Sequence, residues 1–150
     1  MLVQKDYEEL LRLFNKHKVR YCLVGAYAIA FYGIPRFTKD MDILIEPAVD
    51  NAKRILKALN DFGFKSVKLK EADFNKSGKV IQLGYEPIRI DLLTSIDGCD
   101  FAGVWRHKVS GVYGKEKIFF INKADLIKNK NATGRKQDKF DADILKKSKG

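Results

Sequence analysis

The sequence predicts an α/β (α+β) fold, with a mixed β-sheet flanked by helices and further helices at the C-terminal end. A strand–helix–strand–helix order, followed by several closely spaced strands, indicates this class. Apolar residues recur at helical spacing in some segments and form short strand-like runs in others. The length of 150 residues and the hydrophobic content of 45% predict one domain, residues 1–150, with its own core.

Each expected element rests on its hydrophobic spacing and on the glycine and proline residues that bound it. Helices are expected over residues 3–16, 26–32 and 52–59 (closed by Gly63), a helical turn over 101–107, and basic helices over 123–130 and 135–147. Strands are expected over residues 21–24, 40–45, 64–69, 80–83, 87–94 and 117–121.

The most informative of these strands carries Asp40 and Asp42 within an apolar run that ends at Ile45. Side chains alternate along a strand, so the two carboxylates share a face, about 7 Å apart. Such a pair repels and resists burial unless a cation lies between them, and Mg²⁺ takes oxygen ligands of this kind. The pattern indicates a metal site. Solvated positions on the polar face of an amphipathic sheet are the alternative.

A third carboxylate, Asp91, lies in the apolar strand 87–94, where it shares a face with Arg89. If this strand lies beside strand 40–45, Asp91 approaches Asp40 and Asp42. Three carboxylates from neighbouring strands suit two metal ions roughly 3.5–4 Å apart, as in phosphoryl transfer.

The segment before the Asp-x-Asp strand has the pattern of a phosphate-binding turn. The apolar run 21–24 ends at Gly25, and a short helix follows over residues 26–32. A helix start offers free backbone N–H groups at the positive end of the helix dipole, which attracts phosphate oxygens. Arg36 is placed to pair with a phosphate or to hold a carboxylate in position.

Together these residues resemble the nucleotidyltransferase superfamily, which shares a DNA polymerase β-like core. Its small bacterial and archaeal members carry a strand, Gly-Gly or Gly-Ser, a short helix and then G-x-x-R-x-T-x-D-x-D. The pattern falls here on Gly25, Ala26, Gly33, Arg36, Thr38, Asp40 and Asp42, with the third carboxylate at Asp91. The stretch 130–145 is similar to the terminal motif of abortive-infection and toxin–antitoxin nucleotidyltransferases. Ala26 departs from the pattern because it offers no hydroxyl.

The resemblance implies transfer of a nucleoside monophosphate from a nucleoside triphosphate such as ATP to a hydroxyl acceptor, with release of pyrophosphate. It implies that Asp40, Asp42 and Asp91 are catalytic and hold two Mg²⁺ or Mn²⁺ ions. The nucleotide-binding residues that we expect are Gly25, Ala26, Arg36, Thr38, Lys130 and Arg135. Asp138 and Asp141 are expected either to orient the C-terminal cations or to cap a helix.

Charge indicates the acceptor class. The 29 Lys and Arg residues outnumber the 19 Asp and Glu residues, for a formal charge of +10, with basic stretches at 65–79 and 115–150. Positive charge of this size attracts polyanions, so we expect an RNA acceptor, with tRNA and a toxin role paired with an antitoxin as further expectations. The alternative is that the lysines only keep the protein soluble.

Cysteine usage and hydropathy predict the compartment. Cys22 and Cys99 lie in unlike contexts, which predicts free thiols in a reducing cytoplasm. No apolar run approaches the roughly 18 residues of a membrane span, so we expect no membrane partner.

Two other functions compete with an RNA-modifying enzyme. A small antibiotic-modifying nucleotidyltransferase would have similar length and motif order, although a basic surface would repel cationic aminoglycosides. A basic RNA-binding module with an inactive metal site is the third possibility, suggested by Ala26 alone. The presence of all three aspartates argues against it, because an idle site has no reason to tolerate their repulsion.

Overall fold

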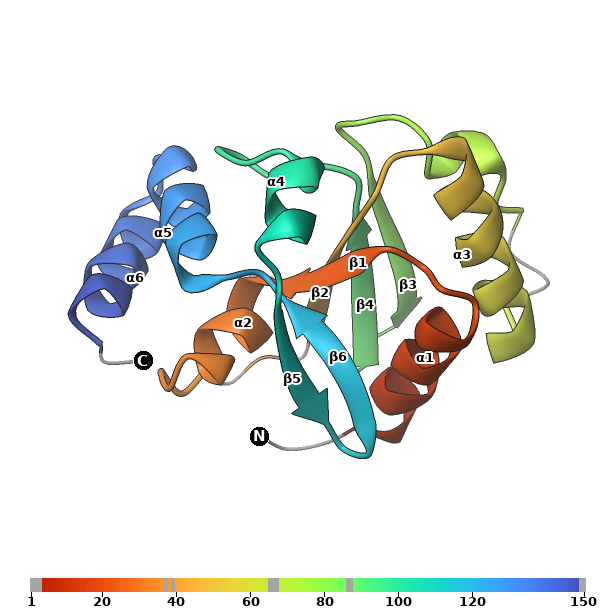
Figure 1. Ribbon diagram of the computed structural model, residues 1–150, viewed down its shortest axis with the longest axis horizontal. Coiled ribbons are helices and arrows are strands. Elements are labelled where there is room, and N and C mark those ends of the chain that lie inside the picture. The colour runs from red at the N-terminus through yellow and green to blue at the C-terminus, as the bar shows by residue number, and fades with distance from the viewer. Residues whose placement is uncertain (1–3, 37, 39, 65–67, 86–87, 149–150) are drawn as a thin grey trace.

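The computed structural model describes residues 4–36, 38, 40–64, 68–85 and 88–148, and within them it has the predicted α/β architecture (Figure 1). The strands are β1 (Tyr21–Val24), β2 (Asp40–Ile45), β3 (Val80–Tyr85), β4 (Ile88–Leu93), β5 (Val109–Tyr113) and β6 (Glu116–Phe120). The helices are α1 (Lys5–Lys16), α2 (Gly25–Phe31), α3 (Val49–Phe62), the 3-10 turn η1 (Glu71–Asp73), α4 (Phe101–Arg106), α5 (Lys123–Ala132) and α6 (Lys136–Lys147).

The sheet is mixed, with strand order β3-β4-β2-β1-β6-β5. Strand β2 runs parallel to β4 and antiparallel to β1, while β1 runs parallel to β6. All four residues of β1 are buried, because this strand lies in the middle of the sheet. The sheet therefore sets β1, β2 and β4 side by side, and these are the strands on which the sequence motifs lie.

Two helix pairs lie at opposite ends of the molecule. Figure 1 shows α1 and α3 packed together at one end and α5 and α6 packed together at the other, with the sheet between them. Helix α1 buries Tyr7, Leu10 and Phe14 in the core. Helix α3 ends at Gly63, whose φ of 113° is the left-handed conformation that glycine adopts at little cost. The α5–α6 pair instead carries Lys130, whose charge acts on Asp42 of β2.

Two predictions about the strands were wrong or incomplete. The strand expected over residues 64–69 is not formed at Phe64, Lys68 or Leu69, and residues 65–67 lie outside the described residues. Strand β3 is an edge of the sheet and pairs only with β4 among the described strands, so Phe64, Lys68 and Leu69 are not paired with it. Strand β5 was missed, although its pairing with β6 across a tight turn forms a hairpin.

Each helix of the described ranges is either too short or too polar to cross a lipid bilayer. Cys22 is buried in β1, and both it and Cys99 are free thiols, as predicted.

Candidate active site

The structure brings the three predicted carboxylates to one face of two adjacent strands. In the parallel pairing of β2 with β4, Asp42 lies directly beside Asp91, and Asp40 lies beside Arg89. Asp40 lies two residues before Asp42 and therefore shares its face, while Met41 and Ile43 are fully buried on the other face. Strand pairing thus explains how residues about 50 positions apart in the sequence come together.

Gly25 lies against this cluster for a steric reason. It follows β1, whose last residue, Val24, lies beside Asp42 in the antiparallel pairing with β2. Its φ is +66°, and a Cβ atom at this position would come within 2.4 Å of Asp42 Oδ2. Any other residue would be strained and would push Asp42 away. Helix α2 starts here, and its N-cap residue, Val24, makes no side-chain capping hydrogen bond.

The electrostatic consequence of this crowding is seen at Asp42. Burial, together with the negative charges of Asp91 and Asp40, raises the pKa of Asp42 to about 6, while the cations Lys130 and Arg89 act in the opposite direction. Burial also raises the pKa of Asp91, although Arg89 counteracts it. The partly buried cluster therefore carries more negative charge than its neighbouring cations neutralise, and a further cation would reduce the repulsion between the carboxylates.

Arg89 is the cation that the structure places among these carboxylates. Its Nη2 atom lies 2.7 Å from Asp40 Oδ2 and 3.3 Å from Asp91 Oδ2. Within the described ranges, no three Asp, Glu, His or Cys side chains are grouped closely enough to hold a metal ion. Arg89 thus bridges two of the three carboxylates, and the metal site expected from Asp40, Asp42 and Asp91 stays a prediction.

The donor set nevertheless has the chemistry that a divalent metal requires. Oδ1 of Asp40 and Oδ1 of Asp91 are buried and have no hydrogen-bond partner among the described residues. Hard cations such as Mg²⁺ take carboxylate oxygens of this kind as ligands. The residues present therefore fit such an ion in chemical type.

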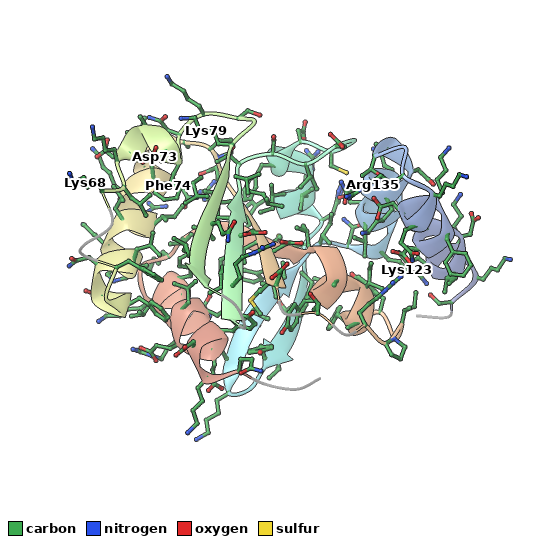
Figure 2. All side chains as sticks on the ribbon, turned by 180° about the vertical axis from the view of Figure 1, so that it is seen from behind. Lys68, Asp73, Phe74, Lys79, Lys123 and Arg135 are labelled. Carbon is green, nitrogen blue, oxygen red and sulfur yellow. The ribbon has the colours of Figure 1, made fainter. Side chains whose placement is uncertain are left out.

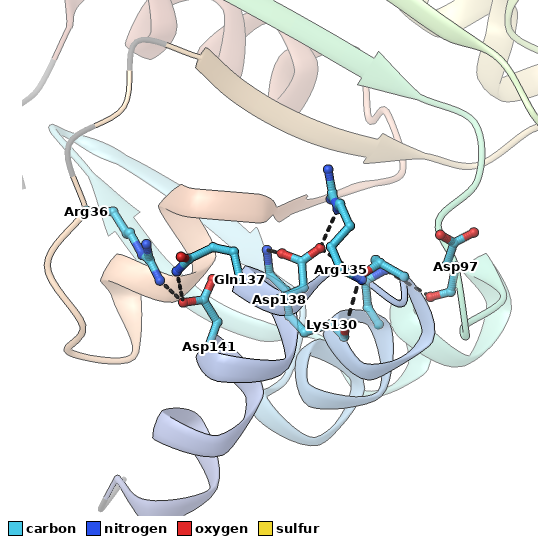
Figure 3. A network of polar contacts seen from close by, with 9 residues as sticks. Arg36, Asp97, Lys130, Arg135, Gln137, Asp138 and Asp141 are labelled. Atoms are coloured by element: carbon cyan, nitrogen blue, oxygen red, sulfur yellow. Dashed lines mark hydrogen bonds and ion pairs between the residues drawn. The ribbon is translucent and has the colours of Figure 1, made fainter.

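Two of the expected nucleotide-binding residues have intramolecular partners. Thr38 donates its hydroxyl proton to the Asp40 carbonyl and accepts a hydrogen bond from the Asp40 N–H, each at 3.1 Å. Arg36 forms an ion pair with Asp141, which is almost fully buried on α6 and also accepts a hydrogen bond from Gln137 (Figure 3). Arg36 thus holds a carboxylate, which was the second of its two expected roles, and ties α6 to the segment that enters β2.

Two further expected nucleotide-binding residues, Lys130 and Arg135, meet at Asp138 (Figure 3). Lys130 Nζ lies 3.1 Å from Asp138 Oδ1, and Arg135 Nε lies 2.7 Å from Asp138 Oδ2, which also accepts a hydrogen bond from Thr133. Burial disfavours the ionised form of Asp138, but the hydrogen bonds from Thr133 and Lys130, the Lys130 charge and the Arg135 contact outweigh it and lower its pKa. Asp138 therefore orients Lys130 and Arg135, which was one of the two roles expected for it, the other being to cap a helix.

Lys130 connects this network to the aspartate cluster. Only 12% of its side chain is exposed, and its charge acts on the ionisation of Asp42. Arg135 is 75% exposed and remains accessible to a ligand.

The sequence interpretation missed the role of Arg89. The alternation that placed Asp91 on the polar face of β4 placed Arg89 on the same face, so the signal was present. Its pairing with Asp40 depends on the neighbouring strand, which no local pattern reveals.

Comparison with known proteins places this geometry within a known fold. No protein-family model matches the sequence, and no curated protein sequence is significantly similar to it. Among solved structures, the chain is similar to the lincosamide antibiotic adenylyltransferase LnuA with lincomycin bound, with a TM-score of 0.61 and 21% identity over 97% of this chain and 98% of LnuA. It is also similar to a Thermotoga maritima protein provisionally classed as a nucleotidyltransferase, with a TM-score of 0.58 and 19% identity over 97% of this chain and 94% of that one.

Both similarities extend over nearly the whole length of each chain. The chain therefore has the nucleotidyltransferase fold that its sequence motifs predicted.

Proposed function

We propose that the protein is a nucleotidyltransferase that moves a nucleoside monophosphate from a nucleoside triphosphate to a hydroxyl group. The acceptor oxygen forms a new bond to the α-phosphorus, the bond from that phosphorus to the bridging oxygen breaks, and pyrophosphate leaves. The observation that carries the proposal is the position of Asp40, Asp42 and Asp91 on one face of two adjacent strands, against Gly25. Phosphoryl transfer requires positioning and charge neutralisation more than covalent chemistry, which suits this site.

Each residue of the cluster has a distinct task in this proposal. Asp40 and Asp42 would hold divalent metal, and Asp91 would hold a second ion and orient the acceptor hydroxyl. Bound Mg²⁺ or Mn²⁺ would neutralise the triphosphate and favour ionisation of the acceptor hydroxyl.

The nucleotide-binding residues act through backbone groups and cations. The N–H groups at Gly25 and Ala26 are proposed to contact phosphate oxygens at the uncapped start of α2. Lys130, held by Asp138, and the exposed Arg135 are proposed to contact the triphosphate. Thr38 and Arg36 are proposed to support the nucleotide indirectly, by fixing Asp40 and helix α6.

RNA is the acceptor that we propose first. More specifically, we propose a toxin-type enzyme that is paired with an antitoxin. The formal charge of +10 supports it. Figure 2 shows Lys68 and Lys79 at one end of the molecule and Lys123 and Arg135 at the other, so the positive charge is not confined to the nucleotide-binding side. An extended polyanion can contact both ends, whereas a small molecule cannot.

An antibiotic is the second candidate acceptor. The similarity to LnuA, an adenylyltransferase of lincosamide antibiotics, favours it. The same cluster would then transfer a nucleoside monophosphate to a hydroxyl of a small drug.

A transfer assay separates these acceptors. The protein is incubated with Mg²⁺ or Mn²⁺, each labelled nucleoside triphosphate in turn, and either total RNA or lincomycin. We expect labelled RNA, and we expect Asp42→Asn to reduce labelling at least about a hundredfold, because loss of a metal ligand costs more than loss of its outer partners. Asp143→Asn is the matched control, because Asp143 is exposed on α6.

Each other outcome has a definite meaning. Labelled lincomycin without labelled RNA would select the second acceptor. Labelling that persists in Asp42→Asn would refute the assigned site. Absence of transfer to either acceptor, with no stabilisation by millimolar nucleotide and metal, would favour an inactive RNA-binding module.

A further inference from the structure

Arg89 is bonded to two of the three aspartates, in the place where a cation is needed. It lies on β4 two residues before Asp91, and its Nη2 atom contacts both Asp91 and Asp40. The backbone at this point is anchored, because Tyr7 donates its hydroxyl proton to the Arg89 carbonyl at 3.0 Å. Only the side chain of Arg89 is therefore free to change its position, and that side chain is 28% exposed.

The contacts that Arg89 makes are incomplete. It reaches Oδ2 of Asp40 and Oδ2 of Asp91, while Oδ1 of each carboxylate is buried with no partner among the described residues. Its own Nε is also buried without a partner within that part of the chain. Buried polar groups in proteins are nearly always hydrogen-bonded. A guanidinium that leaves polar atoms unsatisfied on both sides is a poor fit compared with a ligand that uses them.

The charges point the same way. Three carboxylates converge here, and the positive charges that act on Asp42 are those of Arg89 and of Lys130, which is also hydrogen-bonded to Asp138. A divalent ion carries twice the charge of Arg89 and accepts several carboxylate oxygens as ligands. Arg89 and a divalent metal ion cannot both bind the Asp40 carboxylate closely, because the two positive charges would repel each other.

We propose that Arg89 is the resident counter-ion of the aspartate cluster and that a divalent metal binds the carboxylates of Asp40, Asp42 and Asp91 only when the Arg89 side chain withdraws. The metal-free cluster is thereby neutralised in part, and metal affinity depends on the equilibrium between the bonded and withdrawn positions of Arg89. This inference rests on the proposed function, in that it assigns the cluster to a divalent metal. Arg89 is thus a positioning residue that acts through the metal ligands.

The size of the effect follows from that equilibrium. The apparent dissociation constant of the metal equals its intrinsic value divided by the fraction of molecules in which Arg89 has withdrawn. If Arg89 is bonded in about nine molecules of ten, its removal tightens metal binding about tenfold.

The experiment titrates the metal-free protein with Mn²⁺ alone, with free Mn²⁺ detected by electron paramagnetic resonance and no nucleotide present. We expect Arg89→Gln to bind Mn²⁺ about tenfold more tightly than the original protein. Arg12→Gln removes the same formal charge from an exposed pair with Glu9 on α1, and should leave the affinity unchanged. Circular dichroism melts show whether each variant is folded.

Arg89→Lys is the second variant. Lysine keeps the charge but lacks the planar fork that bridges two carboxylates, so Mn²⁺ should bind more tightly than to the original protein, by a smaller factor than in Arg89→Gln. This variant decides the question if Arg89→Gln does not fold.

Failure of this inference differs from failure of the proposed function. Unchanged or weaker Mn²⁺ binding in the Arg89 variants, with Asp42→Asn abolishing binding, would overturn the role of Arg89 and leave the metal site intact. Absence of Mn²⁺ binding in every variant would also overturn the role of Arg89. The proposed function would then be tested by the RNA-labelling assay alone. Tighter Mn²⁺ binding in Arg89→Gln without transfer by any variant would support the role of Arg89 and refute the enzyme.

Discussion

Two aspartates of this protein, Asp138 on α6 and Asp42 on β2, are both removed from solvent to a large degree, and their pKa values move in opposite directions. The pKa of Asp138 is lowered, and that of Asp42 is raised to about 6. Asp138 faces Lys130, Thr133 and Arg135, which together satisfy both of its oxygens. Asp42 faces other carboxylates.

The opposite pKa shifts distinguish a carboxylate with a structural role, Asp138, from one that we propose binds a ligand, Asp42. Around Asp138, donors and acceptors are matched, so the group orients two cations and needs no further partner. Around Asp42, negative charge exceeds positive charge, and neighbouring oxygens on Asp40 and Asp91 are buried without partners among the described residues. A protein gains nothing in stability from such crowding, so a binding function explains it better.

Gly25→Ala tests the aspartate cluster and has the largest expected effect. The new Cβ would overlap Asp42 Oδ2, and φ at this position is +66°. We expect a loss of about 4 kcal/mol of unfolding free energy, and a loss of transfer activity of at least about a hundredfold from displacement of Asp42. Urea denaturation and the labelling assay measure the two effects.

Gly33→Ala is the matched control for this variant. Gly33 also has a positive φ, +93°, but among the described residues, its two chain neighbours aside, no atom lies within 4 Å of the position of its Cβ. It should cost only about 1 kcal/mol and leave activity unchanged in the fraction that is folded. Equal effects of the two variants would show that crowding at Asp42 is unimportant.

Asp138→Asn tests the network on α5 and α6. It leaves Lys130 and Arg135 without their shared counter-ion, and only 12% of the Lys130 side chain is exposed. We expect a loss of about 3 kcal/mol of unfolding free energy, together with weaker nucleotide binding, as measured by chemical denaturation and calorimetry. Asp143→Asn, on the exposed side of the same helix, should change neither quantity. A stable Asp138→Asn protein would contradict the view that this group is structural.

Substitution of Asp42 is expected to change stability less than Asp138→Asn does and in the opposite direction, and the change should depend on pH. Because folded Asp42 holds its proton more tightly than the unfolded chain does, its ionisation destabilises the fold as pH rises from about 4 to above 6. Asp42→Asn removes this loss. The variant should therefore be more stable than the original protein at pH 8, by at most about 3 kcal/mol, with the difference vanishing near pH 4. Thermal melts of metal-free protein at several pH values measure it, and a less stable variant at pH 8 would contradict the charge imbalance.

Ala26→Ser has the smallest expected effect. It adds the hydroxyl that the family pattern often has at the start of α2, next to the cluster. We expect nucleotide binding to tighten about threefold, because one added neutral hydrogen bond contributes roughly 0.5–1.5 kcal/mol. Calorimetry with metal and nucleotide measures it, with Ala102→Ser on α4 as the control. A decrease in affinity would show that phosphate does not lie beside this residue.

Local patterns in the sequence were sufficient for most of the framework. Strand β2 and the face shared by Asp40 and Asp42 follow from alternation, and the end of α3 at Gly63 follows from glycine's left-handed conformation. The position of Asp91 beside Asp42 required only that two apolar strands be neighbours, which the fold provides. The prediction that residues 1–150 form one domain stays a prediction.

Contacts between distant segments could not be predicted in the same way. The pairing of Arg89 with Asp40, 49 positions away, depends on strand register. The ion pair of Arg36 with Asp141 depends on how α6 packs, and nothing near either residue indicates it. The sequence predicted a basic helix here, yet α6 buries Asp138 and Asp141. The counter-ions are Lys130 on α5 and Arg135 at the start of α6 for Asp138, and Arg36 for Asp141.

A crystal structure with Mn²⁺ and a non-hydrolysable nucleoside triphosphate would test the central claim most directly. The anomalous signal of Mn²⁺ locates the ion independently of the model for the protein. We predict manganese in contact with carboxylate oxygens of Asp40 and Asp42, triphosphate beside Gly25, and Arg89 separated from Asp40. Manganese bound elsewhere, with Arg89 still bridging Asp40 and Asp91, would contradict the account.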